Sequence, residues 1–227
     1  MKPLVVACVH GNEPYGLEVG RRLPPFFSFL VANPGAVEKN ARFVDADLNR
    51  VFPGNAQGNQ EERIAAALAQ RLKGKFVVDL HSTSEPCPLF GIITKPCMLA
   101  AARRLGLQKV VFMTPAFAKG KALIDHCKGI SLEVGPHDRK ENAGEALACF
   151  DHYLEGKKSN PELFKVVGIV RGRGTPLIQN FVPVRKGECI AKDPDVYADK
   201  DFVPFLVGEK SYSDVLCLQA VATTSFG

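Results

Sequence analysis

The feature of this sequence that most constrains its fold is an alternation of short apolar runs with amphipathic stretches over the first two thirds of the chain. Short apolar runs are typical of buried strands, and apolar residues at helical spacing are typical of covering helices. Strand-like runs lie at residues 4–9, 27–32, 76–80, 110–113 and 130–134, and helix-like stretches at 60–73, 97–105 and 141–155. The alternation predicts an α/β fold whose mixed, mostly parallel central sheet is flanked by helices.

The composition changes near residue 157. Residues 157–161, Lys-Lys-Ser-Asn-Pro, are typical of a linker, and short β-like runs broken by Gly and Pro follow them. We therefore predict two domains, an α/β domain over residues 1–157 and a small β-rich domain over residues 158–227.

Charge and cysteine usage narrow the class of protein. The net charge is +5, but the cations are dispersed, Trp is absent, and only R-G-R-G at 171–174 hints at nucleic acid. No apolar run approaches the roughly 18–20 residues of a membrane span. The seven cysteines form no C-x-x-C pair, which indicates reduced thiols in the cytoplasm. We expect no nucleic-acid or membrane partner, and a homo-oligomer is left open.

Polar residues follow several of the strand-like runs. His10 follows the run at 4–9, His81 follows the run at 76–80, and Glu133 follows Ile-Ser-Leu in a third run. Ligands bind outside the carboxyl ends of the strands in an open α/β sheet. Parallel neighbouring strands would bring these three side chains to one rim.

Three of these polar residues suit a metal. Glu13 lies three residues after His10 in H-G-N-E, and His81 lies in D-L-H. Two imidazoles and one carboxylate are ligands of a catalytic zinc ion that keeps a fourth position open. The alternative is that each is an ordinary polar residue at a strand end. H-G-N-E directly after one apolar run and D-L-H after another favour one zinc ion per chain.

Glu133 is the candidate for the base that such a site needs. A carboxylate at a partly buried rim has the raised basicity that suits proton transfer. The alternative is a structural role, in which Glu133 caps the turn at Gly135 and Pro136.

A short loop, A-R-F-V-D-A-D-L-N-R, concentrates charge. Arg42 and Arg50 offer forked donors to a carboxylate or a developing oxyanion, and Asn49 adds a neutral donor. The alternative is that the arginines simply pair with Asp45 and Asp47. Phosphate-loop, dinucleotide-binding, H-E-x-x-H and G-x-S-x-G motifs are absent from the sequence.

Together these motifs resemble the aspartoacylase and succinylglutamate desuccinylase family, a branch of the zinc carboxypeptidase superfamily. The motifs occur in the family's order, and the match is strong over residues 4–136. They are H-G-N-E (10–13), N-P (33–34), R-F-V-D-A-D-L-N-R (42–50), D-L-H-S-T-S (79–84) and E-V-G-P (133–136).

The resemblance implies a zinc-carboxypeptidase-like fold and a zinc-dependent hydrolase that deacylates a small anionic N-acyl amino acid. It implies that His10, Glu13 and His81 bind Zn²⁺. It also implies that Glu133 activates the attacking water and then protonates the leaving amine.

The resemblance assigns further residues to the substrate. It implies that Arg42 polarises the scissile carbonyl and that Asn49 and Arg50 hold the substrate carboxylate. It also implies that a tyrosine of the C-terminal β-rich domain, which we place at Tyr212, reaches over the site.

One departure concerns the amino-acid half of the substrate. Aspartoacylases carry an arginine upstream of the general base that grips the second carboxylate, whereas residues 119–132 contain none. Lys121, His126 and Lys128 are the candidates to replace it, so the acyl group and the amino acid stay open.

Two other functions compete with the deacylase. A zinc carboxypeptidase acting on a short peptide would use the same metal and base in a longer cleft. A catalytically silent metal-binding homologue would need neither Glu133 nor the two loop arginines, so their presence disfavours it.

Overall fold

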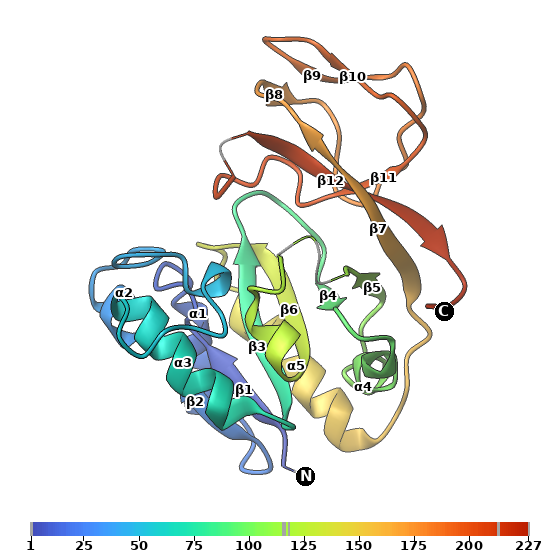
Figure 1. Ribbon diagram of the computed structural model, residues 1–227. Coiled ribbons are helices and arrows are strands. Elements are labelled where there is room, and N and C mark those ends of the chain that lie inside the picture. Colours follow the sequence, from blue (N-terminus) through green and yellow to red (C-terminus); the bar gives the residue numbers. More distant parts are fainter. Residues whose placement is uncertain (1, 115–116, 118, 213, 227) are drawn as a thin grey trace.

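The computed structural model describes residues 2–114, 117, 119–212 and 214–226. Within these residues a nine-stranded sheet forms the centre of the molecule (Figure 1). Its strands are β1 (Leu4–Ala7), β2 (Ser28–Val31), β3 (Phe76–Thr83), β4 (Phe90–Ile93), β5 (Lys109–Phe112), β6 (Lys128–Pro136), β7 (Glu162–Arg171), β11 (Val203–Phe205) and β12 (Val215–Thr223). The helices are α1 (Tyr15–Arg22), α2 (Pro34–Glu38), α3 (Gln60–Leu72), α4 (Leu99–Arg104) and α5 (Asn142–Glu155), with short 3₁₀ turns η1 (Leu48–Arg50), η2 (Pro96–Met98) and η4 (Leu123–His126).

The sheet is mixed and mostly parallel, as the sequence predicts. Its strand order is β11-β12-β7-β5-β4-β6-β3-β1-β2. Strand β4 runs antiparallel to β6, and β12 runs antiparallel to both β7 and β11. The other neighbouring pairs are parallel. The predicted strands do not include β4, because Gly91 interrupts its short apolar run and glycine is depleted in strands.

Helices cover both faces of the sheet around β1, β3 and β6, which explains why these strands are buried almost throughout. Alternate residues of β1 enter opposite layers: Val5 and Ala7 join the core beneath α1, α4 and α5, whereas Leu4 and Val6 join the core beneath α3 and η1. The central strands are therefore packed between two apolar layers, one on each face of the sheet.

Helix α3 begins where local sequence signals place it. The Asn59 side chain accepts from the Glu62 N–H while the Glu62 side chain accepts from the Asn59 N–H, which forms a capping box. Acidic residues occupy the first turn and Arg71 the last turn, where they complement the helix dipole.

The C-terminal part of the chain continues the central sheet. Strand β7 pairs in parallel with β5, and β12 pairs with β7. A separate three-stranded sheet, β8 (Thr175–Pro176), β9 (Cys189–Lys192) and β10 (Val196–Tyr197), has its own apolar cluster. Strands from both sides of residue 157 thus share one sheet, which shows no break at that residue. The division into two domains stays a prediction.

None of the helices in the described ranges combines the length and apolar character needed to cross a membrane.

Candidate active site

Strand pairing places two of the predicted residues side by side. In the parallel ladder of β3 and β6, His81 lies opposite Glu133. Both residues lie inside their strands, since β3 continues to Thr83 and β6 to Pro136. His10 arrives from β1 through a turn at Cys8, whose φ of 55° redirects the chain.

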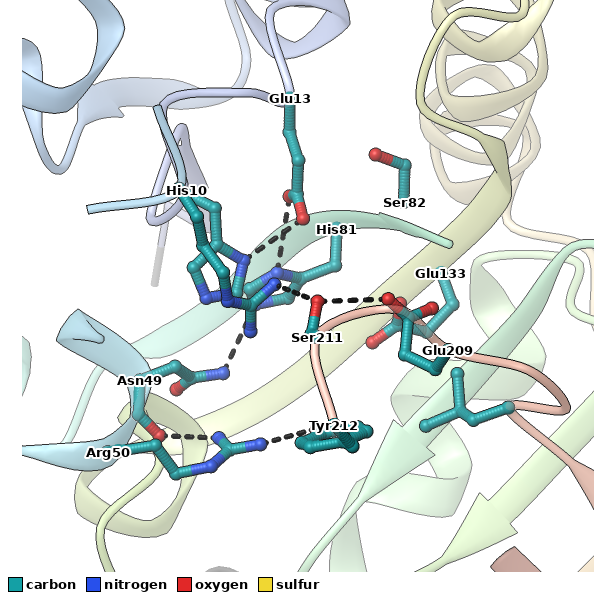
Figure 2. Close-up of a pocket in the computed structure, with 12 residues that line it drawn as sticks. His10, Glu13, Asn49, Arg50, His81, Ser82, Glu133, Glu209, Ser211 and Tyr212 are labelled. Carbon is teal, nitrogen blue, oxygen red and sulfur yellow. Dashed lines mark hydrogen bonds and ion pairs between the residues drawn. The ribbon is translucent and has the colours of Figure 1, made fainter. Parts of the chain in front are cut away.

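His10, Glu13 and His81 form a buried cluster (Figure 2). One ligand-type atom from each lies within 4.8 Å of the other two. Nδ1 of His10 lies 3.0 Å from Oε1 of Glu13, and Nδ1 of His81 lies 3.3 Å from Oε2. This Oε2 is buried and has no hydrogen bond to any described residue. Two imidazoles facing a buried carboxylate oxygen fit a zinc ion.

Each histidine is held from behind by an aspartate. Nε2 of His10 lies 3.1 Å from Oδ1 of Asp47, and Nε2 of His81 lies 2.8 Å from Oδ2 of Asp79. Carboxylates in this position orient metal-binding histidines and raise their basicity. Both histidines therefore direct Nδ1 toward Glu13. Neither role was predicted from the sequence, although the spacing of D-L-H places Asp79 and His81 on the same face of a strand.

The buried charges compensate one another. Burial raises the pKa of Glu13, but His10 and His81 outweigh it and hold the pKa below its ordinary range. Burial lowers the pKa of His81, but Asp79 and Glu13 outweigh it and hold the pKa well above its ordinary range. The cluster therefore favours positive charge between its carboxylates, which a bound cation would supply.

The pKa of Glu133 is shifted in the opposite direction to that of Glu13. Burial raises its pKa to about 8; His81 opposes this rise, whereas the nearby carboxylates of Glu13, Glu209 and Asp79 add to it. A carboxyl group with a pKa close to neutral can both accept and return a proton.

Arg42 is anchored on two sides. Its Nε and Nη2 donate to Oδ2 of Asp47 at 3.1 and 2.9 Å, and its Nη1 donates to Oγ of Ser211 at 2.8 Å. The pairing with Asp47 that the sequence left open is therefore present. Arg42 nevertheless lines the same cavity as the histidine cluster.

Asn49, Arg50 and Tyr212 form the other wall (Figure 2). Oδ1 of Asn49 accepts from the Leu123 N–H at 2.8 Å, which leaves Nδ2 3.4 Å from Nε2 of His81. Arg50 donates to its neighbour's carbonyl, Asn49 O, at 2.7 Å and to the Tyr212 hydroxyl. The tertiary structure thus brings every residue that the resemblance assigns to the metal, the water or the substrate to one cavity of about 380 Å³, part of which is open solvent.

The loop that carries Arg42 is fixed by Glu61, whose role the sequence analysis missed. This buried carboxylate accepts from the N–H groups of Val44, Asp45 and Ala46 at 2.8 to 3.1 Å. It also accepts from Nδ2 of Asn33 at 3.0 Å, which accounts for the N-P motif. By sequence alone Glu61 is one of two acids in the first turn of α3.

The C-terminal segment closes the cavity through Glu209, which the sequence analysis also missed. Glu209 is buried and accepts from the Ser84 N–H at 2.9 Å and from Oγ of Ser211 at 3.0 Å. Ser211 is the residue that accepts from Arg42. A continuous set of hydrogen bonds therefore joins the end of β3, the C-terminal segment and Arg42.

The candidates for the missing arginine lie elsewhere. Lys121 and Lys128 are exposed. Nε2 of His126 lies 2.9 Å from the carbonyl oxygen of Gly120, and its ring stacks on Phe52. None of the three lines the cavity that holds the histidine cluster.

Comparison with known proteins identifies the family. The family model of the succinylglutamate desuccinylase/aspartoacylase catalytic domain matches residues 2–143. The chain belongs to this family. An N-acyl-aromatic-L-amino acid amidohydrolase (carboxylate-forming) from Rattus norvegicus is 26% identical, with 93% of this chain and 88% of that protein aligned. A succinylglutamate desuccinylase from Pseudomonas paraeruginosa is 34% identical over 32% of this chain and 26% of that protein. A probable aspartoacylase from Acaryochloris marina is 32% identical, but only 36% of this chain and 34% of that protein are aligned.

Solved structures share the fold. Murine aminoacylase 3 superposes with a TM-score of 0.79 at 23% identity, covering 98% of this chain and 95% of that one. A succinylglutamate desuccinylase/aspartoacylase from Rhodobacter sphaeroides gives a TM-score of 0.74 at 18% identity, covering 99% of this chain and 86% of that one. The α/β architecture predicted from the sequence is thereby confirmed.

Proposed function

We propose that this protein is a zinc-dependent amidohydrolase that deacylates small N-acyl amino acids carrying a free carboxylate. The observation that carries the proposal is the presence, in one cavity, of a buried His-Glu-His cluster and a glutamate whose pKa is raised to about 8. The similarity to an N-acyl-aromatic-L-amino acid amidohydrolase and to a succinylglutamate desuccinylase supports it.

His10, Glu13 and His81 would hold the zinc ion. A bound zinc ion would supply Lewis acidity, which lowers the pKa of water and polarises a carbonyl oxygen. Glu133 accepts the proton of the attacking water and returns it to the nitrogen of the leaving amino acid. Its raised pKa allows both steps near neutral pH.

Arg42 and Arg50 have different roles in the proposed reaction. Arg42 stabilises the negative charge that develops on the carbonyl oxygen, since charge that grows in the transition state is where a fixed donor accelerates the reaction. Arg50 and Asn49 bind the substrate carboxylate, and Tyr212 holds the Arg50 guanidinium through its hydroxyl.

The first test is metal content. We expect one zinc ion per chain in the intact protein and a large loss in His81→Ala. His152→Ala is the matched control, because that ring lies near the carbonyl oxygen of Arg104, outside the cavity. Equal zinc content in the two variants would contradict the ligand assignment.

The second test is a substrate panel. We expect the zinc-loaded protein to release amine from N-acyl amino acids, and to lose this activity when the substrate carboxylate is amidated. Faster cleavage of dipeptides, or equal cleavage of amidated substrates, would favour the carboxypeptidase instead.

A further inference from the structure

A second cavity adjoins the candidate active site. It encloses about 1010 Å³, part of which is open solvent, and it shares Asn49, Arg50, Glu133 and Tyr212 with the first cavity. His10, Glu13, His81 and Arg42 line only the first cavity. The two cavities therefore meet at the groups proposed to bind the substrate carboxylate.

The walls of the second cavity are mainly apolar. The main apolar residues come from β4, the segment after β5, η4, β7 and β12, so both parts of the chain contribute. The main apolar residues are Ile92, Met113, Ile124, Ile169, Val215 and Leu218. All of them belong to, or pack against, the core cluster on that face of the sheet. Their positions are therefore fixed by core packing.

The described part of this wall offers no buried, unpaired cation for a second carboxylate. Arg50, which donates to Tyr212 and to the carbonyl oxygen of Asn49, is the group proposed to bind the first carboxylate. Arg171 pairs with Asp214 at the rim, where the side chains are 65% and 58% exposed. Burying a carboxylate without a paired cation is costly.

The order of chemical groups in an N-acyl amino acid indicates which of them lies beside the second cavity. In the proposed function, the scissile carbonyl is polarised at the histidine cluster and Arg42, and the carboxylate is bound by Asn49 and Arg50. The carboxylate and the amino-acid side chain share one α-carbon, so the side chain lies beside the second cavity.

We propose, on the basis of the proposed function, that the second cavity binds the side chain of the substrate amino acid. The substrates are then N-acyl derivatives of large apolar amino acids such as leucine and phenylalanine. N-acylaspartate and N-acylglutamate are discriminated against.

Equilibrium binding tests this proposal without turnover. Calorimetry on Glu133→Gln protein would compare N-acetylphenylalanine, N-acetylleucine, N-acetylalanine and N-acetylaspartate. Each buried methylene is worth about 4-fold in affinity, so we expect the leucine and phenylalanine derivatives to bind at least about 10-fold more tightly than the alanine derivative. The aspartate derivative should bind most weakly. Equal or tighter binding of N-acetylaspartate, or no binding of any of the four, would overturn the proposal.

A matched pair of variants tests the cavity itself. Ile169→Ala removes part of the wall and should weaken binding of the phenylalanine derivative by about 10-fold, as loss of apolar contacts in a pocket does. Binding of the alanine derivative should stay unchanged and reports that the site is folded. Val167→Ala, on the same strand but outside the cavity wall, should change neither. Parallel loss for both ligands in Ile169→Ala would count against the side-chain assignment.

Turnover by the zinc-loaded protein separates the two proposals. Selective binding of apolar derivatives without any amine release would leave the ligand class standing and refute the deacylase. Amine release that is as fast for N-acetylaspartate as for N-acetylphenylalanine would leave the deacylase standing and refute the apolar class.

Discussion

Two carboxylates within one cavity are pushed in opposite directions by their surroundings. Glu13 faces two histidines, and its pKa lies below the ordinary range. Glu133 is buried among further carboxylates, and its pKa rises to about 8. Residues of one chemical type thus receive different tasks: Glu13 is suited to bind a cation and Glu133 to exchange a proton.

The raised pKa of Glu133 predicts how stability depends on pH. In the metal-free protein the charged form is disfavoured by folding, so stability falls as pH rises from about 4.5 through about 8. Glu133→Gln removes this loss. We expect the free energy of unfolding of the variant, relative to that of the parent protein, to be higher at pH 8.5 than at pH 5 by on the order of a few kcal/mol, since each pKa unit is worth about 1.4 kcal/mol.

Urea unfolding with a chelator at both pH values measures this gain. Glu18→Gln is the control, because Glu18 makes an exposed pair with Arg22. If the difference in unfolding free energy between variant and parent were the same at pH 5 and pH 8.5, the Glu133 carboxyl would titrate normally. In the zinc-loaded protein, Glu133→Gln should retain the metal and lose about 10²- to 10⁴-fold in kcat.

Substitutions of Arg42 and Arg50 should change different kinetic constants. A lysine keeps the charge of Arg50 but not the planar fork that matches a carboxylate, so Arg50→Lys should raise KM. Arg42→Ala should lower kcat, because its proposed partner gains charge only in the transition state. Ser211→Ala, which removes one hydrogen bond to Arg42, should have a smaller effect. An Arg42→Ala enzyme with normal kcat and raised KM would reverse the two assignments.

At the scale of elements, the site depends on how a loop without regular structure is held rigid. Glu61, in the first turn of α3, accepts three N–H groups of the loop before η1. Burial raises the pKa of Glu61, but these donors and Asn33 outweigh it and lower the pKa. The same helix therefore anchors the sheet through its apolar face and the arginine loop through its first turn.

Glu61→Gln should loosen this loop. The amide offers one acceptor oxygen in place of two, so buried N–H groups lose their partners, at a cost of about 1–3 kcal/mol for each. We expect lower stability in urea and a lower kcat/KM, since Arg42, Asn49 and Arg50 lie on or beside the loop. Glu18→Gln, on α1, should change neither quantity by more than about 0.5 kcal/mol or its equivalent. Full activity in Glu61→Gln would show that the loop is positioned by other contacts.

At the scale of the whole molecule, the C-terminal part completes both the sheet and the site. Residues Phe164, Val166, Phe205 and Leu218 belong to the core cluster that also contains Leu4 and Leu48. Glu209, Ser211 and Tyr212 line the cavity. The part of the chain after residue 157 therefore shares a core and a site with the part before it.

This sharing predicts that residues 1–157 alone will not form a stable protein. Removal of β7 leaves β5 as an uncovered edge strand and exposes apolar core residues, a combination that promotes aggregation. We expect the fragment to be insoluble or oligomeric by gel filtration, whereas the full chain is not aggregated. A soluble fragment with a cooperative unfolding transition would support an independent first domain.

The sequence by itself determined the alternation of strands and helices, the helix over residues 60–73 and the polar residues at the site. These follow from local chemistry: strand and helix periodicity, capping side chains and metal-ligand types are all readable within a few residues. Motif order then placed His10, Glu13, His81 and Glu133 in one family pattern.

Only the tertiary structure decided which groups hold those residues and what lies beside them. Glu61 and Glu209 are ordinary acids in the sequence, and their roles arise from partners far along the chain. The apolar cavity is likewise built from segments that lie far apart in the chain. Such long-range contacts depend on how strands pair and layers pack, and no local pattern specifies them.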